Sequence, residues 1–231
     1  MSRIDGPRMP PARAGKPAKL VILAHGYGSN GDDLMALAPY LSQALPDAMF
    51  VAPHGPEPVP GYPDGRQWFP ITRMDPAALA RGVADAAPAF DRFLDQELQR
   101  YQLPASALAL VGFSQGTMMA LHVGLRRRER IGAIIGFSGA LAVPPAGRVA
   151  SPPSVALIHG DQDEMIPVEA LFATATTLAD RGVPSIWKVS PGLGHAISED
   201  GLALAAAVLK AGLSGALADW KAPAPKSHHE S

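Results

Sequence analysis

A serine between two glycines is the pattern in this chain that most directly implies chemistry. Gly-Phe-Ser-Gln-Gly at residues 112–116 follows the apolar run 107–111 and leads into the mostly apolar stretch 117–123. A serine at such a strand-to-helix turn has a strained backbone and an exposed hydroxyl, and the glycines leave room where strand and helix pass each other. The pattern predicts Ser114 as a catalytic nucleophile.

A serine hydroxyl is a weak nucleophile and needs a base beside it. His195, in the Gly-rich stretch 191–195 beyond the last predicted strand, is the candidate base. A carboxylate must orient such a histidine, and both Asp161 and Asp163 follow the predicted strand 155–159. Spacing favours Asp163, which can reach a neighbouring loop, over Asp161, whose side chain is expected to close its own turn. Spacing alone still leaves Asp161 open as the alternative acid.

The negative oxygen of a tetrahedral intermediate needs backbone N–H donors held in place before the reaction. In a strand-turn-helix arrangement of this kind, one donor is the residue after the nucleophile, here Gln115, and the other lies in the loop after an early strand. The Gly-rich segment 25–31 is that loop, and Tyr27 is the predicted second donor.

Other glycines and histidines have simpler interpretations. Ser138 lies in half of a similar motif, but a Pro-Pro pair and no convincing helix follows, so we expect it to be structural. His25, His54 and His159 are too scattered for a metal site at helical spacing, and no His-Glu-x-x-His motif occurs. The Gly-rich loop lacks the Gly-Lys-Ser/Thr of a phosphate loop. We therefore expect neither a metal nor an organic cofactor.

Strands and helices must position these residues. Apolar runs alternate along the chain with amphipathic or Ala/Leu-rich stretches. Runs without polar alternation predict strands buried on both faces at 20–24, 48–52, 107–113, 131–137, 155–159 and 185–189. Helices are predicted at 32–45, 83–101, 117–127, 168–181 and 198–213. The alternation predicts an α/β fold with a parallel sheet that helices cover on both faces.

A chain of 231 residues can form one domain with a sizeable core, and we place that domain at residues 18–214. Residues 1–17 are expected to be an N-terminal extension, and the polar tail 221–231 is expected to be disordered. The segment 53–76 is rich in Pro and Gly around Trp68. It predicts a long ordered loop or partial cover, too broken to hold an element of its own.

The composition excludes several classes of function. With 20 Lys and Arg against 21 Asp and Glu, the formal charge of −1 provides no cationic field for nucleic acid or anionic lipid. The chain has no cysteine, which removes disulfides, thiolate metal sites and a thiol nucleophile. Residues 1–19 contain no apolar stretch of signal-peptide length, and no apolar run elsewhere approaches a membrane span, so we expect a cytoplasmic protein without stable membrane insertion.

With these residues in view, the chain resembles the phospholipase/carboxylesterase family of α/β-hydrolases, which includes the acyl-protein thioesterases. The resemblance runs from about residue 18 to residue 213 and is carried by the segments 25–28, 52–53, 67–69, 112–121, 137–139, 159–163, 166–167 and 194–195. It implies the α/β-hydrolase fold, with a mainly parallel central sheet and no separate lid domain.

The resemblance also implies roles for individual residues. It implies Ser114, Asp163 and His195 as the catalytic triad, and its His-Gly-x-x-Asp pattern favours Asp163 over Asp161. It implies backbone donors at Tyr27 and Gln115, and an acyl groove beside Trp68, with Phe69 as a further substrate contact. Members of the family often form dimers, so the resemblance implies that this chain can form a homodimer.

Two positions depart from the family pattern and bear on the acyl pocket. Many members read Trp-Phe-Asp where this chain has Pro70, and His-Gly-Leu-Gly where it has Tyr27. We predict a serine hydrolase of small carboxylic esters, with short to medium acyl chains, that acts through an acyl-enzyme. The alternatives are an acyl-thioesterase or lysophospholipase, and, outside enzymes, a hydrolase-like protein that binds a small ligand.

Overall fold

A seven-stranded sheet with helices on both faces forms the body of the protein in this computed structural model, which describes residues 4–71 and 75–216. The strand order is β1-β3-β2-β6-β7-β8-β9, and every neighbouring pair is parallel except β1 with β3. The strands are β1 (Arg8–Met9), β2 (Lys19–Ala24), β3 (Ala48–Val51), β6 (Leu108–Phe113), β7 (Ala133–Phe137), β8 (Ser154–Gly160) and β9 (Ser185–Ser190).

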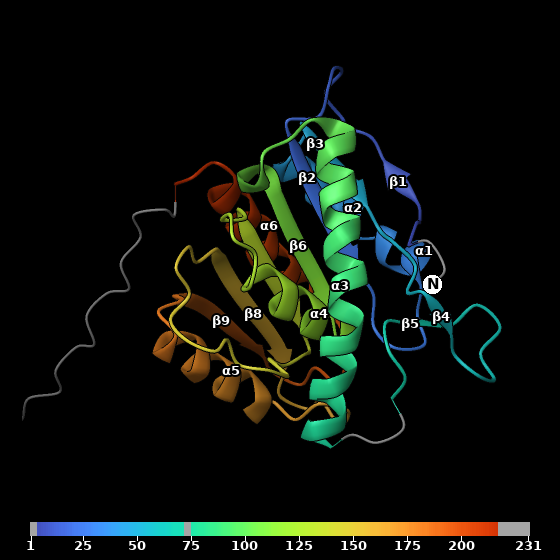
Figure 1. The fold of residues 1–231 in the computed structure, drawn as a ribbon, viewed down its shortest axis with the longest axis vertical. Coiled ribbons are helices and arrows are strands. Elements are labelled where there is room, and N and C mark those ends of the chain that lie inside the picture. The colour runs from blue at the N-terminus through green and yellow to red at the C-terminus, as the bar shows by residue number, and fades with distance from the viewer. Residues whose placement is uncertain (1–3, 72–74, 217–231) are drawn as a thin grey trace, which may run out of the picture.

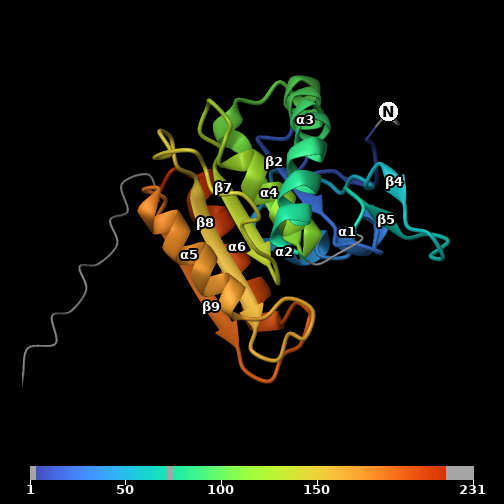
Figure 2. The same ribbon diagram turned by 60° about the horizontal axis from the view of Figure 1, so that its bottom comes forward.

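The helices form one layer on each face of the sheet (Figures 1 and 2). They are α1 (Gly31–Met35), α2 (Ala38–Ala44), α3 (Pro76–Tyr101), α4 (Gln115–Gly124), α5 (Glu169–Asp180) and α6 (Glu199–Leu213), with a 3-10 turn at Ala105–Ala107. Side chains of α3, α4 and α5 share one hydrophobic cluster with the sheet, and side chains of α1, α2 and α6 share the other. The predicted α/β class and the two-sided covering of the sheet are confirmed.

Two helices differ from the prediction. The single helix expected at 32–45 is broken into α1 and α2, and Pro39, which has no N–H to donate, lies in the first turn of α2. Helix α3 begins well before the predicted residue 83. Asp75 caps it by accepting a hydrogen bond from the Ala78 amide at 2.9 Å, and Pro76 occupies its first turn.

Short strands also appear where none was expected. Residues of the predicted N-terminal extension form β1, which pairs antiparallel with β3. The expectation that segment 53–76 holds no element was wrong, because β4 (Glu57–Pro58) pairs antiparallel with β5 (Arg66–Gln67). The tail predicted to be disordered, 221–231, lies outside the described residues.

The fold brings the predicted site residues to one edge of the sheet. Parallel strands end on the same side, and the loops after β2, β6, β8 and β9 carry the predicted donor loop, nucleophile, acid and base. Within the described part of the chain, no helix combines the length and the apolar character needed to cross a membrane.

Candidate active site

The strained turn predicted at Ser114 is present between β6 and α4. Ser114 has φ 54° and ψ −116°, a conformation that L-residues rarely adopt, and its amide donates to the Phe137 carbonyl at 2.9 Å. A Cβ on Gly112 would lie 2.4 Å from the Thr117 nitrogen, and one on Gly116 would lie 1.9 Å from the Ala24 oxygen. Both glycines are therefore required by the close approach of backbone to backbone.

The predicted base and one of the two candidate acids meet directly. Nδ1 of His195 lies 2.7 Å from Oδ2 of Asp163, whose side chain is fully buried. The other oxygen of Asp163 accepts hydrogen bonds from the Met165 and Ile166 amides, both at 2.9 Å. Burial by itself would raise the pKa of Asp163, but the hydrogen bonds from Ile166 and His195 outweigh it and lower that pKa below its ordinary value.

Asp161, the alternative acid, is engaged elsewhere. Its Oδ1 accepts a hydrogen bond from the Gly192 amide at 2.6 Å, which ties the turn after β8 to the loop that carries His195. The geometry therefore places Asp163 beside the imidazole and Asp161 on the backbone of the neighbouring loop.

The contact with Asp163 determines which ring nitrogen of His195 carries the proton. Because the ionised Asp163 carboxylate can only accept, Nδ1 of His195 donates and Nε2 carries a lone pair. The His195 ring lies 4.9 Å, centroid to centroid, from the ring of Phe113, the residue directly before Ser114. The Ser114 hydroxyl has no recorded hydrogen-bond partner among the described residues, and such bonds often form only once substrate is bound.

The two predicted oxyanion donors lie in different segments, Tyr27 in the loop after β2 and Gln115 directly after Ser114 at the start of α4. The loop after β2 packs on the nucleophile, since a Cβ on Gly26 would lie 3.2 Å from the Cβ of Ser114. Within the described residues, neither the Tyr27 amide nor the Gln115 amide is recorded as donating a hydrogen bond. Their role as donors to a negative oxygen beside Ser114 stays a prediction.

The side chain of Gln115 has a second role that the sequence did not reveal. Its Oε1 accepts from the Trp68 amide at 2.9 Å and its Nε2 donates to the Phe69 carbonyl at 2.7 Å, and the residue is 1 % exposed. One buried amide therefore ties the nucleophile turn to the 53–76 segment. A glutamine after the nucleophile was visible in the sequence, but its partners lie 46 and 47 residues away.

His25 ties the same segment to the donor loop. Its Nε2 accepts from the Gly55 amide at 2.7 Å and its Nδ1 donates to the Gly26 carbonyl at 2.7 Å, while its own carbonyl accepts from the Trp68 indole at 2.9 Å. Burial lowers the pKa of His25 to about 4. The neutral ring, with one donor and one acceptor nitrogen, matches both of its partners.

The two aromatic residues predicted to contact substrate are buried in this structure. Trp68 is 2 % and Phe69 is 3 % exposed, and the Trp68 ring packs against His25 at 5.3 Å and against Phe90 at 4.9 Å. In this structure they hold the cover against the body of the domain. Their contact with substrate stays a prediction.

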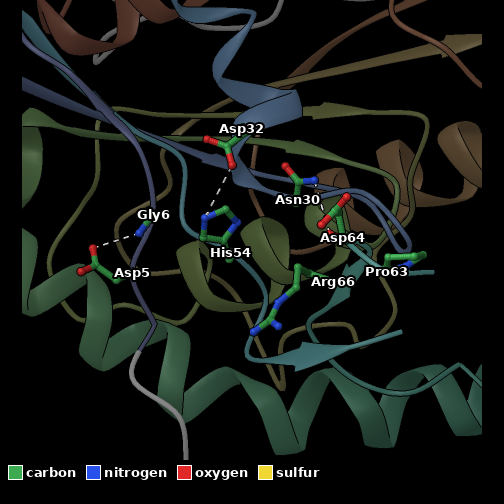
Figure 3. A pocket seen from close by; sticks show the side chains of 8 residues that line it. All are labelled: Asp5, Gly6, Asn30, Asp32, His54, Pro63, Asp64 and Arg66. Atoms are coloured by element: carbon green, nitrogen blue, oxygen red, sulfur yellow. Dashed lines mark hydrogen bonds and ion pairs between the residues drawn. The ribbon is translucent and has the colours of Figure 1, made fainter. Parts of the chain in front are cut away.

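A polar hollow in the structure is lined by residues other than Ser114, Asp163 and His195. Its volume is about 850 Å³, and the polar residues around it include Asp5, Asp32, His54, Asp64 and Arg66 (Figure 3). Arg66 is held by the Gly55 and Pro56 carbonyls. Across residues 4–71 and 75–216, no group of three or more His, Cys, Asp or Glu side chains is arranged to hold a metal ion.

Comparison with known proteins identifies the family. The sequence model of the Phospholipase/Carboxylesterase family matches residues 11–212. Esterase YpfH of Escherichia coli is 31% identical over 184 residues, which are 79% of this chain and 78% of that protein. Acyl-protein thioesterase 1 of Gibberella zeae is 29% identical over 195 residues, 76% of this chain and 82% of that protein.

Solved structures agree. Esterase PE8 superposes with a TM-score of 0.85 at 41% sequence identity, covering 90% of this chain and 99% of that one. The Bacillus cereus carboxylesterase, at 15% identity, 90% and 94% coverage and a TM-score of 0.74, shares the fold. The chain therefore belongs to the phospholipase/carboxylesterase family, has the α/β-hydrolase fold, and is a carboxylesterase-type serine hydrolase.

Proposed function

We propose that this protein hydrolyses small carboxylic esters with short to medium acyl chains, using Ser114 as nucleophile, His195 as base and Asp163 as the residue that orients His195. The observation that carries the proposal is the 2.7 Å contact between Nδ1 of His195 and Oδ2 of Asp163, on a loop beside the strained Ser114 turn. The names of two relatives, esterase YpfH and esterase PE8, support an ester as substrate.

The reaction takes two steps, acylation of Ser114 and hydrolysis of the acyl-enzyme. Nε2 of His195 accepts the Ser114 proton while Oγ attacks the carbonyl carbon, and the amides of Tyr27 and Gln115 stabilise the negative oxygen. The intermediate then expels the alcohol, which leaves with the proton from His195, and an acyl-enzyme remains. A water molecule then attacks the acyl carbon while His195 takes its proton, and the intermediate releases the carboxylic acid as His195 returns that proton to Oγ of Ser114.

Ser138 offers a matched control for the nucleophile. It also follows a Gly-Phe pair, has φ 45° and is fully buried, and its hydroxyl lies 3.4 Å from the Ala196 carbonyl. Ser114→Ala is expected to lower kcat for p-nitrophenyl butyrate by about 10⁴-fold or more. Ser138→Ala should stay within about tenfold, and labelling by a fluorophosphonate should require Ser114 only. Near-normal turnover by folded Ser114→Ala would refute the proposal.

An acyl-thioesterase is the second candidate, because several relatives are acyl-protein thioesterases. Values of kcat/KM on p-nitrophenyl esters of two to sixteen carbons, on acyl-thioesters and on lysophospholipids would separate the candidates. The proposal expects a maximum at the shorter oxygen esters. A maximum on long thioesters or lysolipids would replace it.

We also propose that the protein is cytoplasmic and forms a homodimer. A cytoplasmic location would be tested by cell fractionation, and the homodimer by light scattering of the purified chain. We further propose that the protein does not bind nucleic acid, and a gel-shift assay at low salt would test this.

A further inference from the structure

A second buried histidine contacts the carboxylate that we place behind His195. His159 is the next-to-last residue of β8 and is 1 % exposed. Its Nε2 lies 3.2 Å from Oδ2 of Asp163 and 2.8 Å from the Ile166 carbonyl oxygen. Oδ2 is the same oxygen that Nδ1 of His195 contacts at 2.7 Å.

The partners of His159 determine where its proton lies. A carbonyl oxygen only accepts hydrogen bonds, so the contact with Ile166 requires the proton on Nε2. His159 donates this proton to the Ile166 carbonyl, and Oδ2 of Asp163 lies 3.2 Å from the same nitrogen as an electrostatic contact. The N–H edge of the His159 ring, which carries a partial positive charge, therefore lies beside the carboxylate.

The contacts close into a ring. The Ile166 amide donates to Oδ1 of Asp163, and the Ile166 carbonyl accepts from His159, which also contacts Oδ2. Both oxygens of the carboxylate thus have contacts within this turn, and rotation about the Cβ–Cγ bond of Asp163 would break contacts at both of them.

We propose that His159 is a positioning residue of the hydrolytic reaction: it anchors Ile166, whose amide holds Oδ1 of Asp163, and its Nε2–H edge offsets a share of the negative charge that Oδ2 presents to His195. The inference rests on the proposed function. His159 then acts through Asp163, without contact to substrate or Ser114. It changes how strongly Asp163 favours the imidazolium form of His195, and this change can be measured.

The contact between His159 and Asp163 is the electrostatic link from His159 to His195. Of the described residues, Asp163 is the titratable group recorded in contact with His159, and His195 is reached through it. Asp161, two residues along, is engaged by the Gly192 amide. If His159 acted only as packing for the 163–166 turn, its loss would lower stability without changing the pH dependence of the reaction.

Two substitutions separate these roles. His159→Phe keeps a ring of similar size but removes the donor, and His159→Gln supplies an amide N–H near the position of Nε2. For His159→Phe, kcat should fall about tenfold with KM nearly unchanged, the usual order when a partner that orients an active-site group is lost. The midpoint of the acidic limb of kcat/KM should move up by roughly half a pH unit, because more of the carboxylate charge then acts on His195.

His159→Gln should restore most of kcat and return the acidic limb toward that of the unsubstituted protein. Folded His159→Phe with the original kcat and the original acidic limb would overturn the inference. If His159→Phe does not fold, ring ¹⁵N NMR of the unsubstituted protein decides, since the inference requires the Nε2–H tautomer at His159. The Nδ1–H tautomer would exclude it.

Failure here and failure of the proposed function give different results. If Ser114→Ala and Asp163→Asn are inactive while His159→Phe behaves like the unsubstituted protein, only the role of His159 is wrong. If Ser114→Ala retains turnover, the proposed nucleophile itself is wrong, whatever His159 does.

Discussion

The nucleophile side and the base side of the candidate site are held in different ways. On the nucleophile side, Ser114 lies directly between strand β6 and helix α4, Gln115 is the first residue of that helix, and the side chains of Gln115 and Trp68 are buried and hydrogen-bonded. On the base side, His195 lies on a loop, its side chain is 21% exposed, and Asp163 reaches it from 32 residues away.

The difference shows which parts of the site the sheet fixes and which parts depend on contacts between loops. The nucleophile side needs close backbone packing, so we expect substitutions there to lower the free energy of unfolding. The base side needs one carboxylate in one orientation, so substitutions there should lower kcat and leave stability nearly unchanged. The following experiments test this contrast, from the largest expected effect to the smallest.

The largest effect is expected from Asp163→Asn on the base side. An amide in place of the carboxylate no longer fixes the tautomer of His195 or stabilises its imidazolium, so kcat should fall by about 10³- to 10⁴-fold. Asp161→Asn, whose oxygen still accepts from the Gly192 amide, should lose less than about tenfold. Steady-state kinetics on a p-nitrophenyl ester would measure both. An equal loss in both variants would remove the distinction between the two acids.

A pair of glycines tests the stability side of the contrast. In Gly116→Ala the new Cβ would lie 1.9 Å from the Ala24 carbonyl oxygen, and the resulting backbone shift should lower the free energy of unfolding by about 3 kcal/mol. Gly192, on the base side, has φ +72° and open space around its Cβ position, so Gly192→Ala should cost about 1 kcal/mol. Urea unfolding would measure both, and a larger cost at Gly192 would reverse the contrast.

The lowered pKa of His25 predicts a stability that depends on pH. Because the folded value is about 4 against an ordinary 6.5, the unfolded chain binds more protons between these values. The contribution is therefore complete above pH 6.5 and is lost as the pH falls toward 4. From pH 7 to pH 5 the loss should be about 2 kcal/mol.

Urea unfolding of the unsubstituted protein and of His25→Gln at several pH values would isolate this contribution. Burial, with a smaller effect of Arg126, also lowers the pKa of His122 to about 4, and it should contribute equally to both proteins and cancel in the difference. Parallel pH curves for the two proteins would contradict the assignment to His25.

The smallest effect is expected from a tryptophan pair. Trp68→Phe removes the indole N–H that the buried His25 carbonyl accepts, and should lower the free energy of unfolding by about 1 to 2 kcal/mol. Trp187, 52% exposed on the edge strand β9, packs against Phe172, and Trp187→Phe should change stability by less than about 0.5 kcal/mol. Equal effects in the two variants would show that the cover contributes little to stability.

The sequence predicts the sheet and the nucleophile turn well, because both are local. Runs of apolar residues mark β2, β6 and β8 within a residue or two of their bounds, and the turn at residues 112–116 requires its glycines sterically. The predicted residues are brought to one sheet edge because parallel strands end on the same side. The catalytic roles themselves stay predictions.

What the sequence could not predict depends on partners far along the chain. Strand β1 has two residues and exists through its pairing with β3, and the side chain of Gln115 acts on residues 67–69. Two misses did have local signals. Pro39 marks the break between α1 and α2, and the pair Asp75-Pro76 marks the start of α3.

The double role of Gln115 sets a condition for redesigning this enzyme. A new substrate range would usually be sought by replacing residues 53–71 with the matching stretch of a relative. Here the incoming stretch must present one free amide and one free carbonyl at the positions of Trp68 and Phe69, or Gln115, whose backbone amide we predict to serve the reaction, loses its anchor. Swaps chosen by aromatic shape alone should therefore reduce turnover on every substrate, and swaps that preserve these two backbone contacts should alter selectivity.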